Sequence, residues 1–229
     1  MIYEEQIRAL SKISKAIISD LYLEDILRLI VTITAEAMGS KICSLMLIDE
    51  KKKELVVRAT QSISEAYNKK PPLKISEGIA GRVIKENKPV VVEDVTKEKE
   101  YKHKDIALKE GLKSLLCVPM AVKGRVIGII NCYTSKLHRF SETETNLLTS
   151  IANQAAVAIE NAELVIKSRL IQEELDTRKR LERAKGILMR KEHITEEEAY
   201  LRLQKYSMDK RKSMREVAEA IILMEEITK

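Results

Sequence analysis

The stretch LLCVPMAVKGRVIGIINCYTSKLHRFSETETNLLTS, residues 115–150, decides the fold of this 229-residue chain. Two runs of β-forming residues, 115–122 and 126–134, flank a compact Lys-Gly-Arg turn and therefore predict an antiparallel hairpin. Ser141 and Glu144 then stand at the spacing of a capping box, which marks the start of a helix. A β-hairpin followed at once by a helix indicates a chain of mixed α and β structure.

Upstream of the hairpin, apolar residues alternate between helical and strand spacing. This pattern predicts an α+β class in which helices bracket the strands. The polar segment 94–111 is expected to fold over the sheet. The other expected elements are helices over residues 7–18, 26–38 and 76–87, and strands over residues 42–48, 54–60 and 89–92.

From Ser141 onward the pattern stays helical, without Pro or Gly, until Gly186. A helix of this length usually needs a partner along it. Val157, Leu164 and Ile171 are spaced by seven residues, as in the seam of a coiled coil. We therefore expect a parallel homodimer through this helix; the alternative is a helix that packs in part against its own domain.

Composition excludes several classes of protein. Three widely spaced cysteines in apolar runs, with no Cys/His ligand spacing, argue against a metal site and fit a reducing cytoplasm. No apolar run approaches the ~20 residues that span a bilayer, and no signal peptide is visible, so we expect no membrane contact. No nucleophile–base set or phosphate loop is visible, so we do not expect an enzyme.

Two clusters of basic residues occupy the last third of the chain. Residues 178–191 hold seven Lys/Arg against Glu182, and residues 205–215 hold five against Asp209. Such clusters are an electrostatic footprint for phosphates, although solvated helix faces would look the same. The first contains an Ala-Lys-Gly triplet within a helix, where a glycine costs about 1 kcal/mol relative to alanine. Gly186 therefore calls for a close approach, either of a ligand or of another helix.

The region from about residue 21 to 162 resembles a GAF domain. The matching words are GIAGRVIKENKPVVVED at 78–94 and the run from Leu115 to Ala162. The resemblance implies a central antiparallel sheet with the first and last helices on one face and ligand-enclosing loops on the other. No cyclic-nucleotide motif or bilin-attachment cysteine is recognisable, so the cofactor-binding residues are unknown and the ligand is an unidentified small molecule. His103 lies in the segment that covers the pocket in relatives.

The region from about residue 171 to 227 resembles the ANTAR domain, an RNA-binding module of bacterial antiterminators. The matching words are LERAKGILM at 181–189, TEEEAY at 195–200 and REVA at 215–218. The resemblance implies a three-helix bundle that holds RNA hairpin loops, one hairpin per protomer of a dimer. Many members carry Arg where this chain has Gln204, beside Lys205. The expected RNA-binding residues are Arg180, Arg183, Lys185, Gly186, Lys205, Arg211, Lys212 and Arg215.

The chain is thus expected to divide into a GAF sensor domain with N-terminal helices (1–160), a coiled-coil linker helix (161–177) and an ANTAR domain (178–229). The leading hypothesis is a transcription antitermination regulator that binds tandem hairpins in nascent mRNA under control of a signal at the GAF domain. The alternative is a non-enzymatic signalling adaptor whose C-terminal bundle docks a protein partner. A DNA-binding helix-turn-helix fits less well, because the loop between Met189 and Thr195 is wrong for a tight turn.

Overall fold

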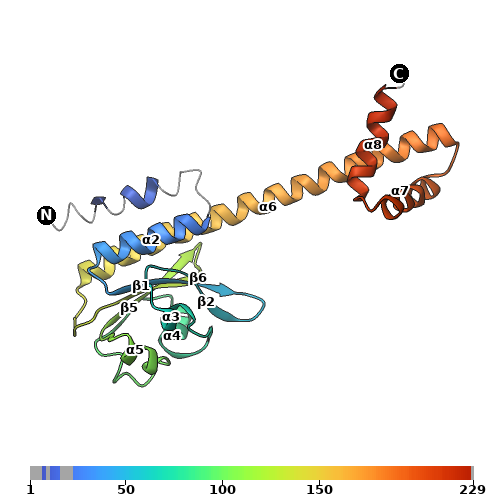
Figure 1. Ribbon diagram of the computed structural model, residues 1–229. Helices are drawn as coiled ribbons and strands as arrows, with labels where there is room; N and C mark the ends of the chain where they lie inside the picture. Colours follow the sequence, from blue (N-terminus) through green and yellow to red (C-terminus); the bar gives the residue numbers. More distant parts are fainter. Residues whose placement is uncertain (1–6, 9–10, 16–22, 228–229) are drawn as a thin grey trace. The chain divides into compact units, whose positions relative to one another are not determined.

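The computed structural model describes residues 7–8, 11–15 and 23–227, and it divides into two compact units after Ala162. Figure 1 shows the elements of both units. Residues 7–8 and 11–15 are helical, and the rest of the helix expected over 7–18 lies outside the described residues. The elements are α2 (Leu23–Ala37), β1 (Ile42–Asp49), β2 (Glu54–Thr60), α3 (Glu65–Asn68), β3 (Leu73–Lys74), α4 (Gly78–Glu86), β4 (Val90–Val92), α5 (Lys104–Lys109), β5 (Leu115–Val122), β6 (Arg125–Tyr133), α6 (Glu142–Glu192), α7 (Glu196–Lys210) and α8 (Met214–Ile227).

The N-terminal unit is built on one six-stranded antiparallel sheet with the order β3-β2-β1-β6-β5-β4. The predicted hairpin is confirmed, since β5 pairs with β6 from Leu115↔Tyr133 to Val122↔Arg125. The α+β class is confirmed as well. The two-residue strand β3 and the four-residue helix α3 were not predicted, because elements this short carry no periodicity.

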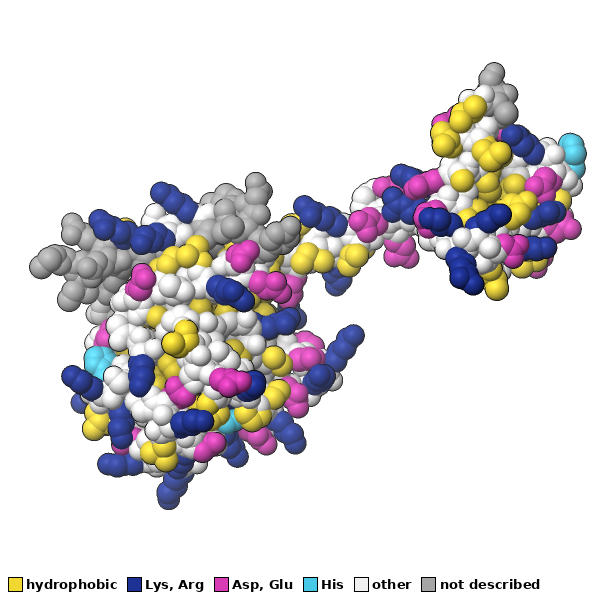
Figure 2. Space-filling model, viewed as in Figure 1, with side chains coloured by type: hydrophobic (Ala, Val, Ile, Leu, Met, Phe, Trp, Pro, Cys, Tyr) yellow, Lys and Arg dark blue, Asp and Glu magenta, His cyan; other side chains and the backbone are white. Residues whose placement is uncertain are grey.

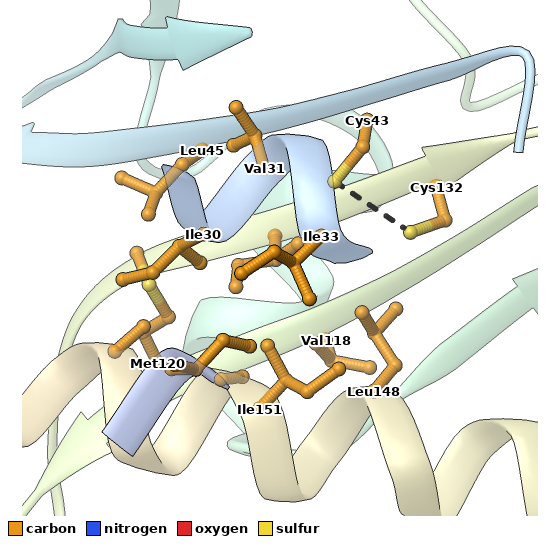
Figure 3. Close-up of a cluster of buried hydrophobic side chains, with 14 of the residues drawn as sticks. Ile30, Val31, Ile33, Cys43, Leu45, Val118, Met120, Cys132, Leu148 and Ile151 are labelled. Carbon is orange, nitrogen blue, oxygen red and sulfur yellow. Dashed lines mark hydrogen bonds between the residues drawn. The ribbon is translucent and has the colours of Figure 1, made fainter. Parts of the chain in front are cut away.

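One face of the sheet is covered by α2 and α6, which lie side by side along it (Figure 1). Alternate residues of β5, such as Val118 and Met120, point to this face and are fully buried. Figure 3 shows them converging with Ile30 of α2 and Ile151 of α6. This period-two alternation against a helical stripe is what fixes the layer order.

The opposite face of the sheet is covered by α3, α4 and α5. Its most distinctive feature is a trio of tyrosines, in which Tyr133 of β6 makes edge-to-face contacts with Tyr67 at 6.0 Å and with Tyr101 at 6.3 Å. The Tyr101 hydroxyl donates to the Tyr133 hydroxyl at 3.2 Å. The segment 94–111 does fold over the sheet, and it contributes the buried residues Ile106 and Ala107 to this core.

The 51-residue helix α6 runs without a break from the first unit into the second. Its predicted capping box is present, with the Ser141 hydroxyl accepting from the Glu144 backbone N–H at 3.2 Å. In the second unit α6, α7 and α8 share a small apolar core that includes Ala184, Leu203 and Ala218. No helix of the described residues is long and apolar enough to cross a membrane.

We predict that Gly128→Ala destabilises the N-terminal unit. A Cβ at Gly128 would lie 2.3 Å from the Met46 carbonyl oxygen and 2.9 Å from Leu47 Cδ2, and neither the paired backbone of β1 nor a packed core yields easily. Overpacking of this kind costs about 1–3 kcal/mol of unfolding free energy. Urea unfolding of the full chain measures the change, and an unaltered midpoint would contradict the geometry.

Candidate nucleic-acid interface

The C-terminal unit positions its charged side chains through two capped helices. Thr195 closes a full capping box with Glu198 at the start of α7, and Ser213 does the same with Glu216 at the start of α8. Both boxes were predicted from the sequence and are confirmed. Arg211 ends α7 in the left-handed region at φ 50°, and its backbone N–H donates to the Met208 carbonyl oxygen. These caps hold the second basic cluster beside the end of α6.

Lys185 is the predicted contact whose surroundings are most distinctive. Its ammonium lies 2.8 Å from Glu182 Oε1 and 2.6 Å from Glu196 Oε1, and its side chain is only 10% exposed. Hydrogen bonds to Glu182 and then Glu196 raise the pKa of Lys185. The lysine therefore bridges α6 to the first turn of α7, and a phosphate would have to displace a carboxylate to reach it.

Four other predicted cations also form ion pairs within the bundle. Arg180 and Arg215 both contact Glu219, the latter at 2.9 Å. Exposed pairs like these add little stability each, so their carboxylates can be exchanged for phosphates at small cost. The remaining pairs are Arg183–Glu226 at 2.7 Å and Lys212–Glu216 at 2.9 Å.

The pKa of the Glu216 carboxylate shows how strongly its ion pair with Lys212 acts. The Lys212 ammonium, followed by the Ser213 cap, lowers the pKa of Glu216 to about 2. Glu216 therefore stays charged throughout the neutral range. A positive charge on Lys212 is offset locally, which reduces its value as a free phosphate ligand.

Lys205 and Arg211 are the two predicted cations that remain exposed and form no ion pair with any described residue. Four more Lys and Arg side chains of the two basic clusters are also exposed and without an ion pair to a described residue. They were not among the predicted RNA contacts, although they belong to the two clusters. These are Arg178, Lys179, Arg190 and Lys210. Figure 2 shows Lys and Arg side chains lying among Asp and Glu side chains over this unit, with hydrophobic side chains exposed between them.

Gly186 has open space beside it. A Cβ built there would meet only the Arg190 guanidinium, at an ordinary 3.7 Å from Nη1. Packing among the described helices therefore does not require a glycine, and the helix-packing interpretation is not supported within this bundle. The glycine instead leaves a bare stretch of helix backbone next to an unpaired arginine.

An apolar groove of about 590 Å³ lies in the same unit, between the end of α6, α7 and α8. Ile187, Tyr206 and Ile221 contribute to its wall, and Lys210 and Lys212 lie at its rim. Tyr206 is half-buried and packs against the bundle core, so it serves the core and the groove at once. No group of three or more His, Cys, Asp or Glu among the described residues is arranged to hold a metal ion.

Comparison with known proteins identifies both units. Residues 21–160 match the GAF domain family, and the chain belongs to this family. The GAF domain of a phosphoenolpyruvate-protein phosphotransferase from Coxiella burnetii superposes with a TM-score of 0.64 at 27% identity, covering 70% of this chain and 96% of that one. The phosphoenolpyruvate-dependent phosphotransferase system protein of Escherichia coli K12 is 24% identical over 142 residues, 62% of this chain.

The second unit carries an ANTAR domain, which matches residues 169–222. The transcriptional regulatory protein PdtaR of Mycobacterium tuberculosis is 44% identical over 52 residues, 23% of this chain. The matches span only 19% of the Escherichia coli protein and 25% of PdtaR. The chain thus joins a GAF domain to an ANTAR domain.

We predict that Gly186→Ala stabilises the protein. Alanine is the better helix former by about 1 kcal/mol and would meet no close neighbour here. Thermal unfolding followed by circular dichroism should therefore show a higher midpoint for the C-terminal unit. Gly128→Ala is the matched control, because the same substitution there is expected to act in the opposite direction. A lower midpoint for Gly186→Ala would mean that the glycine serves packing after all.

Proposed function

We propose that this protein is a transcription antitermination regulator that binds tandem hairpins in nascent mRNA through its C-terminal helices, one hairpin per protomer of a dimer. The observation that carries the proposal is the bare backbone at Gly186, flanked by the unpaired Arg190, within the ANTAR domain. The resemblance to PdtaR, a transcriptional regulatory protein, supports it. A small ligand or signal at the GAF domain would control binding, and the protein would act in the cytoplasm without catalysing a reaction.

The chemistry of hairpin loops suits this surface. Loop bases are splayed out and accessible, whereas the deep groove of A-form RNA cannot be read by side chains. Gly186 would let a loop lie directly against α6. The six unpaired cations, with Arg180, Arg183, Lys185, Lys212 and Arg215 exchanging carboxylates for phosphates, would neutralise the backbone and make binding fall with salt. Lys185 would contact a base or phosphate only when Glu182 or Glu196 releases it.

Dimerisation through α6 accounts for apolar residues that the described residues of one protomer leave uncovered. Val157, Leu164, Ile171 and Leu175 are 48%, 55%, 53% and 47% exposed. A helical segment of this kind, with no core of its own, is marginal in water unless a second helix covers it. We propose that residues 161–177 form a parallel coiled coil between the GAF domain at 1–160 and the ANTAR domain at 178–229.

A second candidate is a signalling adaptor whose bundle docks a protein partner. The apolar groove near Tyr206 favours it, because grooves of this kind accept amphipathic helices. A pull-down with and without nuclease separates the two candidates. Capture that survives nuclease treatment, together with absent hairpin binding, would favour the adaptor.

We predict that the full chain binds a tandem-hairpin RNA and that Arg190→Gln weakens this binding by roughly 5- to 100-fold, the loss expected for one arginine contact. Lys185→Ala should weaken it as well. Electrophoretic mobility shifts at low salt measure the dissociation constants. Arg58→Gln, an exposed arginine on β2, is the matched control and should leave the affinity unchanged.

Gly186→Ala sharpens this test, because it should reduce RNA affinity while raising stability. Loss of binding from a more stable protein cannot be ascribed to unfolding. If the dimer binds no hairpin RNA at low salt, the proposed function is wrong.

We predict that Leu164→Glu with Ile171→Glu converts the dimer to a monomer. Each side chain would bury an apolar surface worth about 1.5–3 kcal/mol in each protomer, so the dimer dissociation constant should rise by at least ~100-fold. Sedimentation equilibrium measures it. Ile166→Glu is the matched control, since Ile166 is 54% exposed in the same segment but lies off the seam. Equal effects from both variants would place the interface elsewhere.

A further inference from the structure

A small cavity lies within the GAF domain, on the face of the sheet that carries the tyrosine trio. The space open to the centre of a water molecule is about 20 Å³. One water needs ~10–15 Å³ in this measure. Apolar side chains of β1, α4, β5 and β6 form part of its wall. Its polar lining consists of Lys70, Glu77, Tyr101, Lys102, His103, Asn131 and Tyr133.

Lys70 is buried in this wall, with 8% of its surface exposed. No described residue forms an ion pair or a side-chain hydrogen bond with its ammonium, which lies over the Tyr67 ring at 5.4 Å from the centroid. Burial lowers the pKa of Lys70 to about 8. A buried charge without a counter-ion is costly, so an isolated ammonium beside a cavity indicates a missing negative partner.

His103 provides a second unsatisfied group at the same cavity. Its Nε2 atom is buried and has no hydrogen-bond partner among the described residues. Burial and then the Lys70 charge lower the pKa of His103 to about 4, against the opposing influence of Asp105. The ring is therefore neutral near pH 7, and its Nε2 can donate one hydrogen bond to a group in the cavity.

The acidic groups near the cavity leave Lys70 without a direct counter-ion. Glu77 lines the wall and Asp105 acts on both Lys70 and His103, yet neither carboxylate makes an ion pair with Lys70. Lys102 also lines the cavity, so its lysines outnumber the single lining carboxylate. The Tyr101–Tyr133 hydroxyl pair and the Asn131 amide add neutral polar groups.

We propose that this cavity binds a small anion, a short carboxylate or an inorganic anion of similar size, that neutralises the Lys70 ammonium and accepts a hydrogen bond from His103 Nε2. The inference rests on the proposed sensor role of the GAF domain and names the chemical class of its signal. The anion would link Lys70, after α3, to His103, at the start of α5, across the face of the sheet opposite α6.

The proposal predicts a pH dependence with a definite sign. Because the anion requires a charged Lys70, affinity should fall as the pH rises through about 8 and beyond. The bound anion would also favour a protonated His103, whose pKa should rise from about 4, so affinity should increase toward acidic pH.

The test is isothermal titration calorimetry of the full chain with sodium formate, sodium acetate and sodium nitrate, at constant ionic strength. Formamide and acetamide serve as neutral analogues. At least one anion should bind saturably at one site per protomer, and the amides should not. Lys70→Met should weaken that binding at least tenfold. Lys69→Met is the matched control, because Lys69 is exposed and paired with Glu65. This variant should bind the anion as the original protein does.

The apo protein provides a readout independent of binding. Since Lys70→Met removes an uncompensated buried charge but keeps the apolar stem, its unfolding midpoint without anion should rise. A lower midpoint would make Lys70 a structural residue and overturn the proposal. So would the absence of saturable binding by all three anions, or equal binding by Lys70→Met.

Hairpin-RNA binding is measured separately, in buffer without formate, acetate or nitrate. The two proposals can therefore fail independently. Anion binding without RNA binding would leave the cavity assignment standing and remove the antiterminator. RNA binding without anion binding would do the reverse.

Discussion

The continuity of α6 is the constraint on which the rest of the structure depends. Near its start, Leu148 and Ile151 belong to the core under the sheet, and near its end Ala184 and Leu188 belong to the core of the bundle. Between these two cores the helix contains neither Pro nor Gly. The helix α6 therefore continues from one core to the other, with no residue between them of the kind that kinks a helix.

The middle of α6 carries exposed apolar side chains that a second helix could cover. Its exposed apolar residues, among them Leu164 and Ile171, find no covering partner in the described part of the chain. A second α6 packed along this segment would stabilise the helix and tie the two GAF domains to the two ANTAR domains. A ligand in the sensor could then act only through its different affinities for the arrangements that this helix pair adopts.

Features that depend on residues close together in the sequence were predicted correctly. The hairpin around Gly124 and the capping boxes at Ser141, Thr195 and Ser213 depend on residues within a few positions of one another, so the sequence reveals them directly. Helix α5 and the burial of Lys70 depend on contacts between distant segments. The ion pair of Lys185 with Glu196 joins two helices, and the spacing of apolar residues in the sequence does not predict it. Charge counts therefore located the basic surface but not which of its cations are free.

Two buried lysines show why that distinction matters. Lys185 has two carboxylates within 2.8 Å, so its charge is satisfied by the fold itself and its burial is compatible with a structural bridge. Lys70 is equally buried but has no carboxylate in contact. A protein gains nothing in stability from an isolated internal charge, since an apolar side chain of similar size would pack better. The charge on Lys70 is therefore best explained by something outside the polypeptide, whereas the charge on Lys185 is explained within it. Any role of Lys185 toward RNA must begin with the release of a carboxylate.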